Sequence, residues 1–353
     1  MNNTYTQFKG NNPFASQSKI LFHSDRIADY LQNQDCKPVF CEVNLTDVCN
    51  LRCKWCISDN FRGNSNSLSF IEFCKFASEF KDYGGKALTF SGGGEPTLSK
   101  DFAPCTRFCS SIGLEVGLMT NGCYSSDYNV TIANHMKWMR ISLDTLDVKH
   151  YAEWKGVDRL NVVLNNIKII SKIKSKIKVG INCNIHPDLT VQEVKDLISL
   201  VDEYGLSYVQ FRPIIPRYYT NESLIINDGV WEYLKDINNP KINFSYDKYY
   251  DLTSSKLFPF KACEAHRLNF VLNSNGDICV CMYHPNDSRF VLGNIKNNTF
   301  QEIWQSQQRL DVIKFLQTRL DMKKECQICC KLYELNKLFD FLDTSKDNDI
   351  NFL

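Results

Sequence analysis

Three cysteines stand close together in one short segment, with the spacing Cys49-x₃-Cys53-x₂-Cys56. Iron–sulfur clusters that are held entirely by protein usually take four cysteine thiolates. Three thiolates in one loop can therefore hold three irons of a cubane cluster and leave the fourth iron open to a chelating molecule. The alternative is a structural zinc site with Cys41 or a distant residue as fourth ligand, although this spacing is unusual for zinc.

A second group of cysteines lies in the last quarter of the chain. Its members are Cys263, Cys279, Cys281, Cys326, Cys329 and Cys330. Cys-x-Cys and Cys-x₂-Cys pairs are common in zinc ribbons, so zinc is an alternative for this group as well. The chain has 353 residues and 16 cysteines, and a chain of this length needs no disulfide framework to fold. The clustering of the cysteines therefore favours metal ligands.

The first cysteine group follows a β-rich run, after which the chain alternates strands with helices. The predicted strands are Val39–Asn44, Ala87–Ser91, Glu115–Thr120, Trp138–Leu143, Lys178–Ile185 and Tyr208–Pro213. The predicted helices between them are Ser69–Tyr83, Asp101–Ile112, Ser126–His135, Asp158–Lys174 and Thr190–Tyr204. Strands separated by single helices are typical of parallel βαβ units. We therefore expect an α/β fold with a partial (β/α)₆ TIM-like barrel, in which ligands bind at the carboxyl ends of the strands.

The alternation stops after Pro213. The next segment is rich in Tyr, Asn and Pro and contains one short predicted helix near Asp228–Asp236. A β-hairpin is then predicted from Leu268–Leu272 and Asp277–Cys281, followed by a helix over Phe300–Phe315 and a last helix that ends near Leu342. We expect five parts, namely a lead-in (1–37), the barrel (38–222), a bridge (223–258), a small cysteine-rich domain (259–342) and a tail (343–353).

The first cysteine group resembles the signature of the radical S-adenosylmethionine (SAM) superfamily, CxxxCxΦC, in which Φ is aromatic and is Trp55 here. Its place after the first strand is also where that family carries it. The resemblance implies that Cys49, Cys53 and Cys56 hold a [4Fe–4S] cluster whose open iron binds SAM. An electron from the cluster, supplied by a donor such as flavodoxin or ferredoxin, would then cleave SAM to methionine and a 5′-deoxyadenosyl radical that removes hydrogen from the substrate.

The loop after the second predicted strand resembles another motif of the same family. Gly92, Gly93, Gly94 and Glu95 match the GGE motif, which holds the amino group of SAM. Consecutive glycines let a ligand approach the main chain closely, and a carboxylate can hold an ammonium group. The alternative is an ordinary glycine-rich turn.

Polar residues end the third, fourth and sixth predicted strands. The resemblance implies contacts with the ribose and the methionine carboxylate of SAM for Thr120, Asn121, Ser142 and Asp144. Local turn capping is the alternative for these residues. Arg212 is predicted to contact a carboxylate or to act as a substrate-side acid, with a packing or salt-bridge role as the alternative.

The second cysteine group resembles the SPASM/Twitch extension of radical SAM enzymes. The resemblance is carried by Cys263, Gly276, Cys281, Leu292-Gly-Asn-Ile295, Phe300-Gln-Glu-Ile-Trp304 and Cys326-x₂-Cys329. Only Cys330 follows Cys329, so the shorter Twitch form with one auxiliary [4Fe–4S] cluster fits better. The ligands that this implies are Cys263, Cys281, Cys326 and Cys329. Cys279, which lies on the same strand face as Cys281, and Cys330 are alternatives.

Four thiolate ligands would close the auxiliary cluster to substrate, so electron transfer is the role that the resemblance implies. We therefore expect an oxidoreductase that acts on a sugar, cyclitol or nucleotide, with a domain plan similar to the Twitch-containing aminocyclitol dehydrogenases. The long bridge departs from their pattern. The alternative is a peptide-modifying enzyme that catalyses epimerisation or forms thioether or carbon–carbon crosslinks. A non-enzymatic scaffold or sensor is disfavoured because SAM-site residues follow several strands.

The charge and hydropathy of the chain exclude other classes of partner. Its formal net charge is +1, which does not favour a nucleic-acid backbone. No run of about 18 apolar residues occurs, so we expect no membrane partner. The polar N-terminal segment lacks the apolar core of a secretory signal, and a cytoplasmic location is expected.

Overall fold

The structure is a computed structural model that describes residues 17–214, 227–244, 258–285, 287–327 and 330–345. The predicted ligand Cys329 lies outside the described residues, as do residues 1–16 of the lead-in, residues 346–353 of the tail and part of the bridge. Within the described residues, ten strands form one sheet in the order β10-β9-β8-β1-β2-β3-β4-β5-β6-β7.

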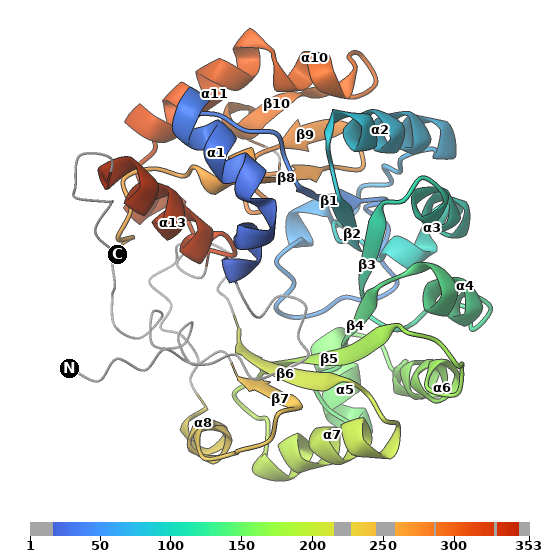
Figure 1. The fold of residues 1–353 in the computed structure, drawn as a ribbon. Helices are drawn as coiled ribbons and strands as arrows, with labels where there is room; N and C mark the ends of the chain where they lie inside the picture. Colours follow the sequence, from blue (N-terminus) through green and yellow to red (C-terminus); the bar gives the residue numbers. More distant parts are fainter. Residues whose placement is uncertain (1–16, 215–226, 245–257, 286, 328–329, 346–353) are drawn as a thin grey trace.

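Six parallel strands with helices on their outer side form the predicted partial barrel (Figure 1). The strands are β1 (Phe40–Asn44), β2 (Ala87–Ser91), β3 (Glu115–Thr120), β4 (Trp138–Ser142), β5 (Lys178–Ile185) and β6 (Tyr208–Pro213). The crossover helices predicted from the sequence are α2 (Phe70–Tyr83), α3 (Phe102–Ser111), α4 (Tyr128–His135), α6 (Leu160–Ile170) and α7 (Val191–Glu203). Each neighbouring pair from β1 to β6 is parallel. The α/β partial-barrel prediction is confirmed.

Two of the crossover helices begin with a capping box. The Ser69 side chain accepts a hydrogen bond from the backbone N–H of Glu72, and the Glu72 side chain accepts one from the backbone N–H of Ser69. Thr190 and Glu193 form the same reciprocal pair at the start of α7. These pairs satisfy backbone donors that the first helical turn leaves open, which fixes where each helix starts.

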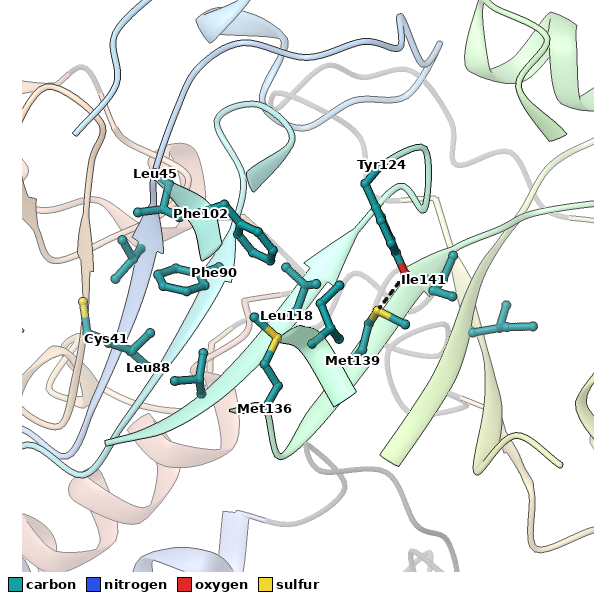
Figure 2. Packing of buried hydrophobic residues seen from close by; sticks show 14 of the residues in the cluster. Cys41, Leu45, Leu88, Phe90, Phe102, Leu118, Tyr124, Met136, Met139 and Ile141 are labelled. Atoms are coloured by element: carbon teal, nitrogen blue, oxygen red, sulfur yellow. Dashed lines mark hydrogen bonds between the residues drawn. The ribbon is translucent and has the colours of Figure 1, made fainter. Parts of the chain in front are cut away.

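The two faces of the barrel sheet differ in polarity. Figure 2 shows the outer face, where Cys41, Leu88, Phe90, Leu118 and Met139 pack with other apolar side chains under the helices. Successive side chains of a strand point to opposite faces, so the residues between these positions line the inside of the barrel. Those inner residues are mostly polar, and they include Glu42, Asn44, Thr89, Ser91, Arg140, Ser142, Asn182, Asn184, Gln210 and Arg212.

The C-terminal hairpin extends the barrel sheet. Strands β8 (Asn269–Leu272) and β9 (Asp277–Cys279) are antiparallel, as predicted. β8 also pairs in parallel with β1, and β10 (Val291–Asn294) pairs antiparallel with β9. At the other edge, α8 (Asp228–Lys235) is followed by β7 (Ile242–Phe244), which pairs in parallel with β6. The sequence had not predicted β7, β10 or the pairing of β8 with β1.

The single helix predicted over Phe300–Phe315 is wrong. The structure has α10 (Phe300–Trp304) and α11 (Gln307–Thr318), because the Ser306 side chain accepts a hydrogen bond of 3.0 Å from the backbone N–H of Arg309 and starts a new helix. Helix α5 (Val148–Lys155), which follows β4, was missed. The remaining α-helices within the described residues are α1 (Ser24–Asn33), α12 (Met322–Glu325) and α13 (Tyr333–Thr344). Short 3₁₀ turns lie at Gln17–His23, Asp59–Phe61, Pro96–Leu98, Ala265–Arg267 and Ser288–Phe290.

The described part of the lead-in packs on the C-terminal region. Tyr30 of α1 and Phe339 of α13 are both buried, and their ring centroids lie 4.6 Å apart. The Asp35 carboxylate accepts two hydrogen bonds of 2.7 Å from the Arg309 guanidinium. None of the described helices has the length and the apolar composition that a membrane span requires.

Candidate active site

The segment that carries Cys49, Cys53 and Cys56 follows β1 and is fixed against helix α5. The backbone N–H of Arg52 donates to the carbonyl oxygen of Lys155 at 2.8 Å, and that of Lys54 donates to the carbonyl oxygen of Trp154 at 2.9 Å. These bonds satisfy two carbonyls at the end of α5 and place Cys53 between two anchored neighbours.

The main chain at the end of α5 lies so close to the cysteine segment that the contact requires a glycine. Gly156 ends α5 with a φ of 74°, and a Cβ atom there would lie 2.7 Å from the carbonyl oxygen of Arg52. Only glycine combines this backbone conformation with so short a contact. The chain turns away from α5 directly beside the cysteine segment.

The three thiols lie within electrostatic range of one another. Burial raises the pKa of Cys49 to about 11, and the charges of Cys53 and Cys56 add to this effect. Burial also raises the pKa of Cys53, which Lys155 partly offsets and Cys56 reinforces. Thiolates that repel one another require a cation to bring them together, and iron supplies that charge. Three thiols in one segment are the donor set that the predicted cluster takes, although the described residues do not place three His, Cys, Asp or Glu side chains close enough together to hold a metal ion.

The glycine-rich loop after β2 lies directly on the cysteine segment. The backbone N–H of Gly94 donates to the carbonyl oxygen of Thr46, and that of Glu95 donates to the carbonyl oxygen of Val48, each at 2.9 Å. A Cβ atom on Gly94 would lie 2.1 Å from the Val48 oxygen, so no side chain fits there. The Ser58 hydroxyl also donates to the carbonyl oxygen of Gly92 at 3.0 Å.

Glu95 is buried and joins this loop to the end of β3. Its Oε1 accepts hydrogen bonds of 2.7 Å from the hydroxyls of Thr97 and Thr120, and its Oε2 accepts one of 2.7 Å from the backbone N–H of Asn121. Burial raises the pKa of Glu95, against the effect of these hydrogen bonds. A carboxylate offers about four acceptor positions, so Oε2 retains one that an ammonium group could use.

A pair of amides links the end of β3 back to the first cysteine. The Asn121 amide donates to Asn50 Oδ1, and the Asn50 amide donates to the carbonyl oxygen of Cys123, both at 2.7 Å. The backbone N–H of Cys123 donates to Asn121 Oδ1 at 2.7 Å. The position of Asn50, next to Cys49, is thereby coupled to the predicted SAM-site residues. Sequence reasoning had not singled out Asn50.

The second cysteine group gathers around the end of the hairpin. The pKa of Cys263 is raised by burial and by the charges of Cys330 and Cys281, and that of Cys281 by burial and by Cys330 and Cys326. The pKa of Cys326 is raised by burial and by Cys263 and Cys330. Four described thiols therefore lie within range of one another, and Cys330 is among them.

Cys279 has different surroundings. Its sulfur accepts a hydrogen bond of 3.2 Å from the Asn273 amide and lies 3.9 Å from the carbonyl oxygen of Pro285. Burial raises its pKa to about 12, and the acidic neighbour that contributes is Asp277 rather than a cysteine. The geometry therefore favours Cys281 over Cys279 as a cluster ligand.

Two protein-family models match parts of the chain that contain these cysteine groups. Residues 43–201 match the model described as the radical SAM superfamily. Residues 263–331 match SPASM, described as an iron–sulfur cluster-binding domain. The chain belongs to the radical SAM superfamily. As a radical SAM enzyme with a SPASM region, it combines SAM and a [4Fe–4S] cluster in the barrel with auxiliary iron–sulfur binding in the C-terminal part.

Curated proteins similar to this radical SAM enzyme include GTP 3′,8-cyclases. The GTP 3′,8-cyclase of Synechocystis sp. is 32% identical over 168 residues, which are 46% of this chain and 50% of that protein. The GTP 3′,8-cyclase of Clostridium perfringens is 30% identical over 183 residues, or 50% of this chain and 56% of that protein. The chain spans about half the length of the curated relatives that it matches.

Solved structures show the fold in common at lower identity. Streptococcus suis SuiB bound to its precursor peptide SuiA has a TM-score of 0.64 at 18% identity and covers 84% of this chain and 71% of its own. Native anSMEcpe with bound AdoMet has a TM-score of 0.61 at 16% identity and covers 88% of this chain and 100% of its own.

The other predicted SAM-site residues of the radical SAM enzyme differ in their surroundings. Trp55 packs edge-on against His186, with ring centroids 4.4 Å apart. Ser142 ends β4 and is half-buried on the inner face, and Arg212 is half-buried on the same face of β6. Asp144 is buried, and its carboxylate is occupied by neighbours within the protein.

Asp144 belongs to a charged network that sequence reasoning missed. Its Oδ2 lies 2.6 Å from Lys155 Nζ and 3.3 Å from His186 Nε2, and its Oδ1 accepts a hydrogen bond of 2.7 Å from the backbone N–H of Asn184. Burial opposes ionisation, but Lys155 and His186 hold the pKa of Asp144 well below its usual value. Asp144 therefore forms a buried ion pair with Lys155. Its predicted contact with SAM stays a prediction.

Proposed function

We propose that this radical SAM enzyme is an oxidoreductase that acts on a polar small molecule of the sugar, cyclitol or nucleotide type. When bound, SAM and its cluster supply a 5′-deoxyadenosyl radical that takes one hydrogen atom from a carbon of the substrate. The substrate then loses a proton and passes one electron to the auxiliary cluster, which balances a two-electron oxidation. An electron donor such as flavodoxin or ferredoxin would supply the electron for SAM cleavage.

One observation carries the choice of substrate class. A row of polar side chains crosses the inner face of the barrel in register, as Ser142 pairs with Asn182, Asn182 with Gln210 and Gln210 with Asn243. The neighbouring residues Val209 and Phe211 point outward into the apolar core. A row of amides and a hydroxyl offers both donors and acceptors, which suits a molecule rich in hydroxyl groups.

Several buried atoms near this row have no hydrogen-bond partner among the described residues. They are Asn182 Oδ1, Asn243 Nδ2 and the hydroxyl oxygen of Tyr208. Each buried polar atom without a partner costs about 1–3 kcal/mol. A polar ligand in the barrel would recover part of that free energy, so these atoms support a hydroxylated substrate.

Positive charge stands beside the same row. The Arg140 guanidinium is buried and donates to Gln210 Oε1 at 3.1 Å. Burial and the neighbouring charge of Arg212 together lower the pKa of Arg140 to about 10. Two neighbouring guanidinium groups favour a substrate that carries an anionic group.

The proximity of four described thiols in the second group supports the electron-accepting step. A cluster held by Cys263, Cys281, Cys326 and one further cysteine has no open iron, so it can exchange electrons but cannot bind substrate. The effect of Cys330 on the pKa values of Cys263, Cys281 and Cys326 supports it as the fourth ligand, and the predicted ligand Cys329 lies outside the described residues. One auxiliary cluster, as in the Twitch form, is part of the proposal.

The test is a substrate screen with anaerobically reconstituted protein, SAM and dithionite. Sugars, sugar nucleotides, nucleotides and cyclitols form one panel, and synthetic peptides form the other. The proposal predicts that a member of the first panel increases 5′-deoxyadenosine release and yields a product lighter by two hydrogens. Stimulation by peptides alone would overturn it in favour of peptide modification.

A further inference from the structure

The end of helix α5 brings a buried lysine to the cysteine segment. Lys155 is the last residue of α5, and its carbonyl oxygen receives the backbone N–H of Arg52, which directly precedes Cys53. The lysine side chain is 5% exposed. A lysine is almost never buried to this extent unless a partner compensates its charge.

Asp144 provides that compensation and holds the ammonium group in one place. Lys155 Nζ and Asp144 Oδ2 are 2.6 Å apart, and the Asp144 side chain is 3% exposed. Asp144 is fixed in turn by the backbone N–H of Asn184 at 2.7 Å and by the ring of His186 at 3.3 Å. The position of the charge is therefore set by β4, β5 and α5 together.

Aromatic packing closes this network off beneath the segment. His186 stacks on Trp154 with centroids 3.9 Å apart and an interplanar angle of 7°, and Trp55 packs edge-on against the same His186 ring at 4.4 Å. Trp55 stands between Cys53 and Cys56 in the sequence. Apolar rings on this side keep water away, so a charge here acts through a medium of low dielectric constant.

We propose that Lys155 is a positioning residue that holds a fixed positive charge at the end of α5, where this helix is hydrogen-bonded to both sequence neighbours of Cys53, and thereby raises the reduction potential of the SAM-binding cluster. The inference rests on the proposed role of Cys53 as a cluster ligand. Reduction adds one negative charge to a cluster, so a nearby cation stabilises the reduced form more than the oxidised form.

The test compares midpoint potentials in anaerobically reconstituted protein. Redox titration is followed by electron paramagnetic resonance, and the signal that changes on addition of SAM identifies the cluster in the barrel. Lys155→Met removes the charge and keeps most of the stem. We expect the ratio of reduced to oxidised cluster at a fixed potential to fall on the order of tenfold, a negative shift of about 59 mV for a one-electron couple.

Lys54→Met is the matched control. Lys54 follows Cys53 directly, but its side chain is 46% exposed and faces Glu153 at 2.5 Å. Water and salt screen such a charge, so its removal should leave the potential unchanged. Lys155→Arg should retain the wild-type potential, since it preserves the charge.

Two further variants separate electrostatics from folding. Removal of one partner of a buried ion pair destabilises a protein more than removal of both. The double variant Asp144→Asn with Lys155→Met should therefore fold and bind iron even if Lys155→Met does not. Its potential should shift negatively, but less than in Lys155→Met. Asp144→Asn alone should shift the potential positively, because the cation loses its counter-charge.

Equal potentials in wild type, Lys155→Met and the double variant would overturn the inference and leave Lys155 as a purely structural ion pair. Failure of the ligand assignment gives a different result. In that case Cys53→Ala would retain the SAM-sensitive signal, which the proposed ligand role does not allow.

Discussion

Glu95 Oε2 accepts a hydrogen bond of 2.7 Å from the backbone N–H of Asn121, which joins the glycine-rich loop after β2 to the end of β3. The same carboxylate accepts the Thr120 hydroxyl at 2.7 Å. Glu95 is thus a brace for two predicted SAM-site segments as well as a candidate partner for the SAM amino group. The two roles predict different effects of a Glu95 substitution on stability and on SAM binding.

Glu95→Gln replaces one of the carboxylate oxygens, which accept hydrogen bonds from Thr120 and Asn121, with an NH₂ group that cannot accept them. We expect a loss of about 1–3 kcal/mol in the free energy of unfolding, because buried donors lose their acceptor, and weaker SAM binding as a consequence. Thermal unfolding and equilibrium dialysis with SAM measure both effects.

The matched control for this variant is Glu115→Gln. Glu115 begins β3, its side chain is 63% exposed and it faces Lys137 at 3.5 Å on the surface. It should change neither quantity. If Glu95→Gln lost SAM binding at unchanged stability, Glu95 would act on SAM directly and the brace would be unimportant.

Cys279 and Cys281 are two residues apart, and we expect only Cys281 to bind the auxiliary cluster. Cys281→Ala should remove the auxiliary cluster and lower the iron content by about half, because a [4Fe–4S] cluster loses one of its thiolates. Cys330→Ala should weaken the same cluster. Cys279→Ala should retain full iron and sulfide content, since the Cys279 sulfur is committed to Asn273 and Pro285. Iron loss in Cys279→Ala with full loading of Cys281→Ala would reverse the assignment.

His150 and Glu193 give the fold a measurable pH dependence. His150 Nδ1 lies 2.7 Å from Glu193 Oε1, and this hydrogen bond raises the pKa of His150. A raised pKa stabilises the fold fully below the unfolded value of about 6.5, and the gain disappears as the pH rises through the folded value. His150 is partly exposed, so the effect should be about 1 kcal/mol or less.

Melting temperatures between pH 6 and pH 9 test this prediction. The difference between wild type and His150→Gln should be largest at pH 6 and should vanish toward pH 9. Glu193→Gln should show the same loss of pH dependence. A difference that stayed constant over this range would mean that packing of His150 on Trp154, at 4.8 Å, dominates instead.

A substitution in the row of polar side chains on the inner face of the barrel should affect the response to substrate without affecting the fold. Asn182 Oδ1 is buried and has no partner among the described residues, so Asn182→Leu should leave the stability unchanged or slightly raised. The same change should weaken substrate-stimulated 5′-deoxyadenosine release at least tenfold if the row holds substrate, with SAM binding retained. Wild-type stimulation in Asn182→Leu would remove Asn182 from the substrate site.

Local signals in the sequence were sufficient for the barrel. Alternating apolar runs, capping residues such as Ser69 and Thr190, and the cysteine spacing predict strands, helices and the first cluster loop. Helix α5 also carried signals that could have been used, because Asp147 caps its start and Gly156 ends it. Its polar residues concealed the short helix within the stretch after β4.

Long-range relationships could not be read from the sequence. β8 lies beside β1 although Phe40 and its partner Asn269 are far apart in the chain, and no local pattern specifies that pairing. Lys155 reads as an ordinary surface lysine until the fold places Asp144 at 2.6 Å. Cys279 and Cys281 occupy the same strand face by alternation, and only the three-dimensional position of the other thiols distinguishes them.

The most direct test of the central claim is SAM cleavage. Anaerobically reconstituted protein receives SAM and dithionite, and 5′-deoxyadenosine is quantified by liquid chromatography with mass spectrometry. The radical SAM assignment predicts release by the wild type and none by Cys53→Ala, which lacks a thiolate of the first cluster. Release by neither protein, with the wild type fully loaded with iron and tested across the substrate panels, would contradict it.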